Sequence, residues 1–247
     1  MVKPRYLSLL SLIGLCGCTP LPPWDPGHLP AGEVTGGSYL FHAETTISDD
    51  WYHMDLRGQT DYRLAVFDDA VAIRARGQGS ASGLMRHLAM DPRLCPEIEW
   101  AWAVTQLQRS ANLFEKSGDD VAASIFLLFG DPGSALNPQS VPTLRYVWTT
   151  DHVAPESIIR NPYMDGVVRS VVVTTEGTPA ASWVIVRRNI VDDFERAFGI
   201  PPADNVHAIA LFTDNDQTQE PVEAFYGWAR AHCTEEGISL EESETWE

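Results

Sequence analysis

Ile125-Phe-Leu-Leu-Phe129 is apolar at every position, and turn-forming Gly, Asp and Pro follow it directly. A strand with one face in water alternates apolar and polar side chains, whereas a strand covered on both faces is apolar throughout. The run therefore predicts a central strand covered on both sides. A strand of this kind indicates two stacked sheets.

The neighbouring runs alternate with a period of two, as half-buried strands do. Examples are Val71, Ile73 and Ala75 against Arg74 and Arg76, and Leu144, Tyr146 and Trp148 around Arg145. Strands are predicted near residues 38–46, 51–56, 60–67, 70–76, 83–90, 97–106, 121–129, 143–149, 167–175, 182–190, 205–213 and 223–232.

Residues 191–198 are predicted to form one short helix, with acidic residues in the first turn, Phe194 and Phe198 four apart, and Gly199 as the stop. Val104 to Lys116 is a weaker helix pattern that also fits a strand followed by a loop. Many strands and few helices predict an all-β, antiparallel, jelly-roll-like β-sandwich over residues 38–233.

The first residues have the pattern of an export signal, with Lys3 and Arg5 before an uncharged apolar run that is too short to span a bilayer. Leu15-Cys16-Gly17-Cys18 resembles the lipobox of bacterial lipoprotein precursors, which implies cleavage after residue 17 and acylation of Cys18. The alternative is an ordinary signal peptide cut after a small residue. Thr19, rather than Asp, implies an outer-membrane lipoprotein facing the periplasm if the host is Gram-negative.

Both ends of the predicted mature chain have compositions that disfavour packing. Residues 18–37 are rich in Pro and Gly and predict an extended tether, and residues 234–247 carry six Glu and predict a solvated acidic tail.

The net charge is −17, and removing Lys3 and Arg5 leaves 15 − 34 = −19. Such a charge argues against nucleic acid and anionic lipid surfaces as partners.

Two cysteines, Cys95 and Cys233, remain after the signal and the acylated Cys18 are set aside. An oxidising compartment favours a disulfide between them, and two buried free thiols are the alternative.

Several stretches, in order, resemble an uncharacterised bacterial secreted family known as domain of unknown function 3047. They cover roughly residues 39–232 and are Glu99-Trp-Ala-Trp-Ala-Val104, Gly118-Asp-Asp-Val-Ala-Ala-Ser-Ile125, Arg145-Tyr-Val-Trp148, Val191-Asp-Asp-Phe-Glu-Arg-Ala-Phe-Gly199 and Leu211-Phe-Thr-Asp-Asn-Asp-Gln-Thr218. The resemblance implies a β-sandwich like galactose- and carbohydrate-binding modules, with no assigned activity. The chain departs from the family in having Ser124 where an arginine is usual.

Acidic pairs adjoin two strongly apolar strands: Asp119-Asp120 precede one, and Asp214-Asn-Asp216 with Thr218 follow the other. Alternate oxygen-bearing side chains suit Ca²⁺, so Asp214, Asp216 and Thr218 are predicted metal ligands, and Asp119 and Asp120 belong to the predicted ligand-binding rim. Asx turns explain the same residues without an ion.

Aromatic residues provide the other predicted binding surface. Trp100 and Trp102 share one strand face, Trp148 lies on another strand with Tyr146, and Trp183, Tyr226 and Trp228 add further rings. Rings on a sheet face can stack on sugars, but the same residues can fill a sandwich core.

These observations favour a non-catalytic, lipid-tethered module of the cell envelope that binds a glycan or an envelope protein. The first alternative is a carbohydrate hydrolase using Asp119, Asp120, Asp214 or Asp216, and the second is a structural outer-membrane subunit.

Cys18→Ala is expected to move the protein from the membrane fraction to the soluble envelope fraction, because an acyl anchor contributes about 0.8 kcal/mol per buried CH₂. Mass spectrometry of the wild-type protein should show an acylated N-terminus at Cys18. An unmodified mature N-terminus at another position would contradict the lipoprotein prediction.

Overall fold

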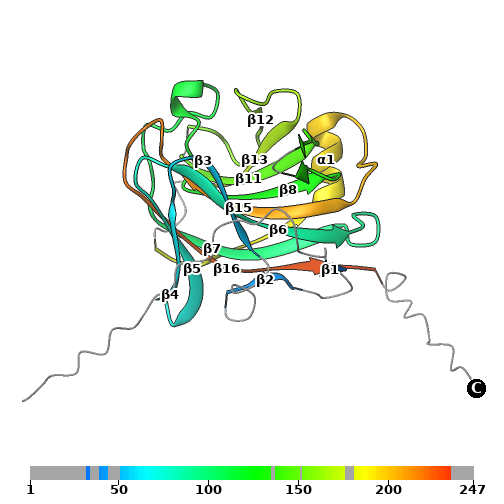
Figure 1. The fold of residues 1–247 in the computed structure, drawn as a ribbon, viewed down its shortest axis with the longest axis horizontal. Helices are drawn as coiled ribbons and strands as arrows, with labels where there is room; N and C mark the ends of the chain where they lie inside the picture. The colour runs from blue at the N-terminus through cyan, green and yellow to red at the C-terminus, as the bar shows by residue number, and fades with distance from the viewer. Residues whose placement is uncertain are drawn as a thin grey trace, which may run out of the picture.

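The computed structural model describes residues 32–33, 39–43, 51–134, 137–150, 152–175 and 181–234. These residues form two stacked β-sheets, seen one above the other in Figure 1. The predicted signal peptide, Cys18 and the tail from residue 235 lie outside the described residues. No helix within the described part of the chain is both long enough and apolar enough to cross a membrane.

The larger sheet, most of which lies in the upper half of Figure 1, has eight strands. In order across the sheet they are β1 (Gly32–Glu33), β6 (Ala81–Met90), β15 (Val206–Asp214), β8 (Ala123–Phe129), β11 (Thr143–Thr149), β13 (Val168–Thr175) and β12 (Ile158–Arg160), and β3 (Tyr52–Arg57) also pairs with β6.

The lower sheet has six strands. They are β14 (Val184–Asn189), β7 (Glu97–Gln106), β16 (Val222–His232), β5 (Ala70–Gly77) and β4 (Asp61–Phe67), with β2 (Tyr39–His42) pairing with β16. A separate small ribbon joins β9 (Gly133–Ser134) and β10 (Asn137–Pro138).

The predicted all-β sandwich is confirmed, and the long strands lie where the alternating runs predicted them. The weaker pattern of residues 104–116 is the end of β7 followed by a loop that reaches the 3₁₀ turn η1 (Lys116–Gly118). Two strand pairs, β11 with β13 and β1 with β6, are parallel, so the sandwich is mainly but not wholly antiparallel. Side-chain periodicity determines which face a residue occupies and carries no information on strand direction.

The central strand β8 lies between β15 and β11, as its apolar sequence predicted. Ile125, Leu127 and Phe129 point into the core between the sheets and are buried. Phe126 and Leu128 face the other side, where they are only partly covered. Coverage of β8 is therefore complete on its inner face and partial on its outer face.

Aromatic side chains fill the space between the sheets. The rings of Trp100 and Tyr146 lie 5.0 Å apart, and those of Trp102 and Trp148 lie 6.0 Å apart, joining β7 of one sheet to β11 of the other. Burial of each large ring contributes about 2–3 kcal/mol.

Tyrosine hydroxyl groups connect the sheets near the end of β15. The Tyr62 hydroxyl donates to the Ser82 carbonyl over 2.7 Å and accepts from the Thr213 amide over 3.0 Å. The Tyr226 hydroxyl donates to the Phe212 carbonyl over 2.9 Å. Both tyrosines belong to the six-stranded sheet, and their partners belong to the other one.

The predicted helix is α1 (Ile190–Phe198), which lies at the end of the sandwich beside β8 and β11. Asn189 caps its N-terminus by accepting from two backbone amides, and Gly199 ends it with a left-handed φ of 82°. The Phe194 ring lies 4.5 Å from that of Phe129 on β8.

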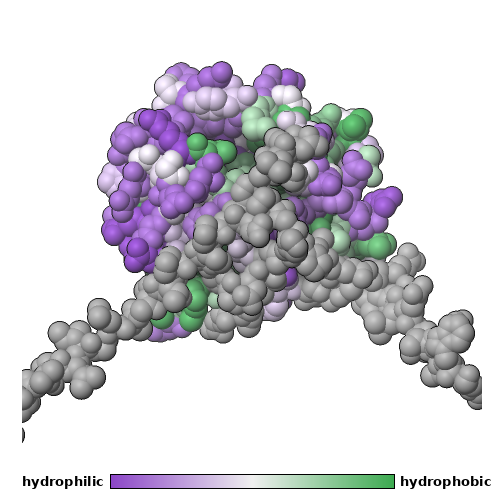
Figure 2. Space-filling view, viewed as in Figure 1, coloured by the Kyte–Doolittle hydropathy of each residue, from purple (hydrophilic) through white to green (hydrophobic). Residues whose placement is uncertain are grey.

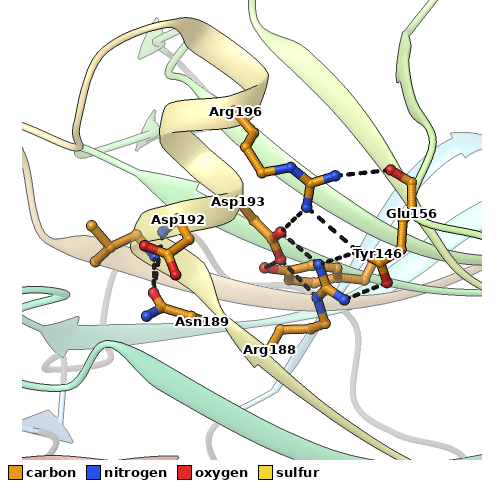
Figure 3. Close-up of polar contacts among 8 residues, drawn as sticks. Tyr146, Glu156, Arg188, Asn189, Asp192, Asp193 and Arg196 are labelled. Atoms are coloured by element: carbon orange, nitrogen blue, oxygen red, sulfur yellow. Dashed lines mark hydrogen bonds and ion pairs between the residues drawn. The ribbon is translucent and has the colours of Figure 1, made fainter.

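An ion-pair network around the buried Asp193 fastens α1 to the sandwich (Figure 3). Asp193 accepts from the Tyr146 hydroxyl over 3.0 Å and from the guanidinium groups of Arg188 and Arg196. Both arginines also contact Glu156 on the loop between β11 and β12. The network neutralises Asp193, which is almost wholly buried, and accounts for its burial without a ligand.

Figure 2 shows the hydrophobic residues of the viewed face in small separate groups among hydrophilic ones. No continuous apolar surface is visible among the coloured residues of that face.

The predicted disulfide is confirmed: Cys95 and Cys233 are bonded across 138 residues of sequence. Cys95 lies just before β7 and Cys233 just after β16, and the two strands are paired partners. The bridge therefore closes the end of this strand pair.

The double variant Cys95→Ala, Cys233→Ala is expected to lower the free energy of unfolding by up to about 4–5 kcal/mol, because the open chain regains the entropy of a long loop. Urea denaturation of the full chain measures this change. Reductant should destabilise the wild-type protein and leave the double variant unaffected. Equal midpoints for oxidised wild type and double variant would contradict the prediction.

Candidate metal centre

The two acidic motifs lie at one end of the eight-stranded sheet. β8 and β15 run antiparallel, with Ser124 paired with Phe212, so the start of β8 lies beside the end of β15. Asp119 and Asp120 precede β8, while Asp214 and Asp216 close β15 and enter the next turn. Strand pairing thus joins motifs that are about 95 residues apart in the sequence.

Three of the four carboxylates form a cluster, which we call the aspartate cluster: Asp120, Asp214 and Asp216. One oxygen atom from each lies within 4.8 Å of the other two, and all three residues are buried. Such an arrangement of oxygen atoms can surround a small cation.

Backbone amides stabilise two members of the cluster. Asp120 accepts from the amides of Gln217 (3.2 Å) and Thr218 (2.6 Å), and Asp214 accepts from the Val121 amide (2.7 Å). The turn after β15 is therefore held by the residue that precedes β8. These bonds join residues 93–98 positions apart, so they are not the local Asx turns that the sequence left open as the alternative to an ion.

Asp216 has a different environment. One of its oxygens, Oδ2, accepts from Arg57 over 3.2 Å, and the Arg57 side chain is 66% exposed. The other oxygen, Oδ1, is buried and has no hydrogen-bond partner.

Thr218 and Asp119 are not part of the cluster. Thr218 contributes its backbone amide, and its hydroxyl accepts from the Glu220 amide over 3.3 Å, so its role as a metal ligand stays a prediction. Asp119 turns away to form a buried pair with Arg145 over 2.9 Å, and it also accepts from the Asn161 side chain over 2.7 Å.

The charges of this region shift the ionisation of its buried groups. Burial raises the pKa of Asp214 well above its usual value, Asp120 and Asp119 raise it further, and Arg145 opposes the shift. Burial would lower the pKa of Arg145, but the carboxylates of Asp119, Asp214 and Asp120 raise it above normal.

Neighbouring loops enclose the cluster. The Gln108 side chain donates to the Asp214 carbonyl, and the Asn215 side chain accepts from the amides of Gly79 and Ser80 in the β5–β6 turn. A Cβ atom at Gly77 would lie 2.5 Å from the Asn215 side-chain oxygen, so only glycine fits there.

Sequence reasoning missed Arg57, Gln108, Arg145 and Asn161 as parts of this region. Arg145 looked like the polar position of an alternating strand, although it is 97% buried. The sequence showed only that Arg145 lies between two core residues, Leu144 and Tyr146, and therefore faces the other side of the strand. Its pairing with Asp119 depends on a loop whose path the sequence does not specify.

The tryptophans predicted as ligand-binding residues are in the core. Trp100, Trp102 and Trp148 are 0–2% exposed and pack between the sheets, so they present no ring face to a ligand. The prediction of a binding surface at these residues is therefore corrected. These residues fill the core of the sandwich, which was the alternative interpretation of the sequence.

The aspartates are also poorly placed for glycoside hydrolysis. That reaction needs two carboxylates on either side of a substrate bond with access to it. Asp119 is in a buried ion pair, and the three members of the aspartate cluster crowd together below the surface.

Residues 49–229 match the family described as Protein of unknown function (DUF3047), and the chain belongs to this family. No curated protein matches the chain.

The fold is similar to several solved structures. One is a family 11 carbohydrate-binding module from Clostridium thermocellum in complex with a β-1,3-1,4-mixed-linked tetrasaccharide (10% identity, TM-score 0.46, 81% of this chain and 98% of that chain). Others are the endoglucanase cel12A from Rhodothermus marinus (10%, 0.45, 80% and 97%) and the K1 cleaved adhesin domain of Lys-gingipain from Porphyromonas gingivalis W83 (12%, 0.39, 80% and 99%). At these identities and TM-scores the likenesses carry no information on ligand or activity.

Arg145→Met is expected to destabilise the protein by about 3–5 kcal/mol, because it leaves the buried Asp119 carboxylate without its cation. The matched control is Arg160→Met, which removes an exposed arginine paired with an exposed Asp165 and should cost less than about 1 kcal/mol. Urea denaturation of the full-length variants measures both. Equal losses would contradict a special role for the Arg145 pair.

Proposed function

We propose that this protein is a non-catalytic module of the cell envelope, tethered by a lipid at Cys18, that binds a glycan on the outer face of its six-stranded sheet. The observation that supports this proposal is a set of aromatic rings on that face, away from the core. Rings of this kind stack on the apolar faces of sugars, and neighbouring polar groups can bond their hydroxyls.

The first group of rings covers β16 and β4. Phe67 stacks on Phe225 with their centroids 4.4 Å apart, and Trp183 lies edge-on to Phe67 at 5.3 Å. Trp183 also lies against Gly227, where an added Cβ would be 3.2 Å from the indole ring. Phe67 and Trp183 are partly exposed, whereas Phe225 is buried beneath them.

The second group lies where β2 joins β16. Tyr39 and Trp228 meet edge to face at 6.4 Å, and Tyr39 is 50% exposed. The Arg230 guanidinium lies 5.3 Å from the centre of the Trp228 ring. Ile185 on β14, which is paired with Ala101, adds an exposed apolar side chain to the same face.

Ion pairs accompany both groups of rings. Arg74 bonds Glu223 over 2.8 Å beside the first, and Arg230 bonds Glu99 beside the second. Carboxylates and guanidinium groups can exchange part of these bonds for sugar hydroxyls. The face thus offers apolar platforms with polar groups at their edges, which favours a glycan over a purely apolar partner.

The tether and the envelope location rest on the N-terminal sequence alone. A lipid at Cys18 with a Pro- and Gly-rich spacer would hold the sandwich near a membrane and within reach of envelope polysaccharides.

Trp183→Ala and Trp228→Ala are each expected to weaken glycan binding by about tenfold or more, since ring stacking contributes roughly 1.5 kcal/mol. The measurement is a glycan-array screen of the full chain in detergent, followed by calorimetry with the glycans retained. Phe114→Ala is the matched control, because it removes an exposed ring from the loop between β7 and η1.

Three results would contradict this proposal. They are the absence of any glycan bound by the wild-type chain, equal losses for Phe114→Ala and the tryptophan variants, and retention of an envelope protein but no glycan. The last would assign a protein ligand instead.

A further inference from the structure

The region around the aspartate cluster has an unbalanced buried charge. Asp119, Asp120, Asp214 and Asp216 supply four carboxylates, and the described residues in hydrogen-bond contact with them include two cations, Arg57 and Arg145. With all carboxylates ionised, the balance is 2 − 4 = −2. Burial of unbalanced charge is unfavourable, and a single divalent cation would neutralise it.

Unused oxygen atoms form the second observation. The Asp216 side chain is only 7% exposed, and its Oδ1 atom accepts no hydrogen bond from any donor of the described structure. The side-chain oxygens of Gln108 and Gln217 are likewise buried without partners, on residues that adjoin Asp214 and Asp216. Buried acceptors without donors are rare in native proteins.

The hydrogen bonds from backbone amides do not supply the missing donor for Asp216 Oδ1. The amides of Val121, Gln217 and Thr218 satisfy Asp214 and Asp120, but none of them donates to Asp216. A proton on Asp214 would remove one negative charge and still leave Asp216 Oδ1 without a partner. A cation at the cluster accounts for both the charge and the free oxygen.

We infer that Asp120, Asp214 and Asp216 bind one Ca²⁺ ion, with Asp216 Oδ1 among its ligand atoms. The donor set consists of hard oxygen atoms, without His or Cys, as calcium and magnesium prefer. The enclosed position favours calcium, because Mg²⁺ requires a strict octahedron and usually keeps several waters.

A cation here would reinforce the contact between the residues before β8 and the turn after β15, which Asp120 already joins through the amides of Gln217 and Thr218. It would therefore stabilise the end of the sandwich where these loops meet. The site does not overlap the aromatic face of the six-stranded sheet, so this inference stands or fails independently of glycan binding.

The test uses the full chain in detergent, stripped of metal with EDTA and dialysed into metal-free buffer. Calorimetry with CaCl₂ should show one ion bound per chain. The melting temperature should rise by several degrees in millimolar CaCl₂ and return on addition of EDTA, because binding to the native state alone stabilises it. Matched MgCl₂ and NaCl samples separate calcium binding from ionic strength.

Asp216→Asn should abolish both the heat of binding and the calcium-dependent shift. The matched control Asp91→Asn removes a partly buried aspartate whose bonds are to Arg93, and it should keep the shift. Circular dichroism shows whether each variant folds. The calorimetry of the wild-type protein tests the inference even if a variant does not fold.

Wild-type protein that shows neither heat nor a shift in calcium would overturn the inference. An equal response to magnesium would overturn the assignment of the ion, and an unchanged shift in Asp216→Asn would overturn the assignment of the ligands.

Discussion

The side chains of Tyr62 and Tyr226 cross the interior of the sandwich, and their hydroxyl groups bond to Thr213 and Phe212, the residues before the last one of β15. Aromatic contacts elsewhere in the core hold the sheets together by apolar burial, a driving force that is itself non-directional. The tyrosine bonds do have direction, and they end at Phe212 and Thr213. The position of Asp214, one residue further along, follows from them.

The same end of β15 determines the remaining polar contacts of the region. Thr213 bonds the Ala122 carbonyl and the Asp214 amide bonds the Val121 carbonyl, so the segment before β8 follows β15 beyond the regular ladder. Asp120 then lies close enough to accept from Gln217 and Thr218. The crowding of buried carboxylates is thus a result of strand pairing.

Residue patterns predicted most of this fold, because burial on one face of a strand leaves a period of two in the sequence. The helix was predictable from local signals, namely the acidic residues in its first turn, the spacing of Phe194 and Phe198, and Gly199 as its stop. The acidic motifs were identifiable because each adjoins a strongly apolar strand. The sequence could not show that the two motifs lie together, because this requires β8 and β15 to be neighbours. Strand order depends on interactions between segments far apart in the sequence. The roles of Arg145 and Asn161 depend on loop paths that leave no periodic signal.

Strand β16 shows why alternation in the sequence can assign an aromatic residue to the wrong face of a sheet. Tyr226 and Trp228 are two residues apart, and strict alternation would place both on one face of β16. The pairing with β7 contains a bulge between them, at Gly227, so Tyr226 faces the core while Trp228 pairs with Ala101 on the outer face. A bulge adds one residue and reverses the parity of everything beyond it. A Cβ atom at Gly227 would lie 3.2 Å from the Trp183 ring, a tight contact that favours glycine at the bulge. A single bulge therefore places Trp228 on the outer face, where a ligand could reach its ring.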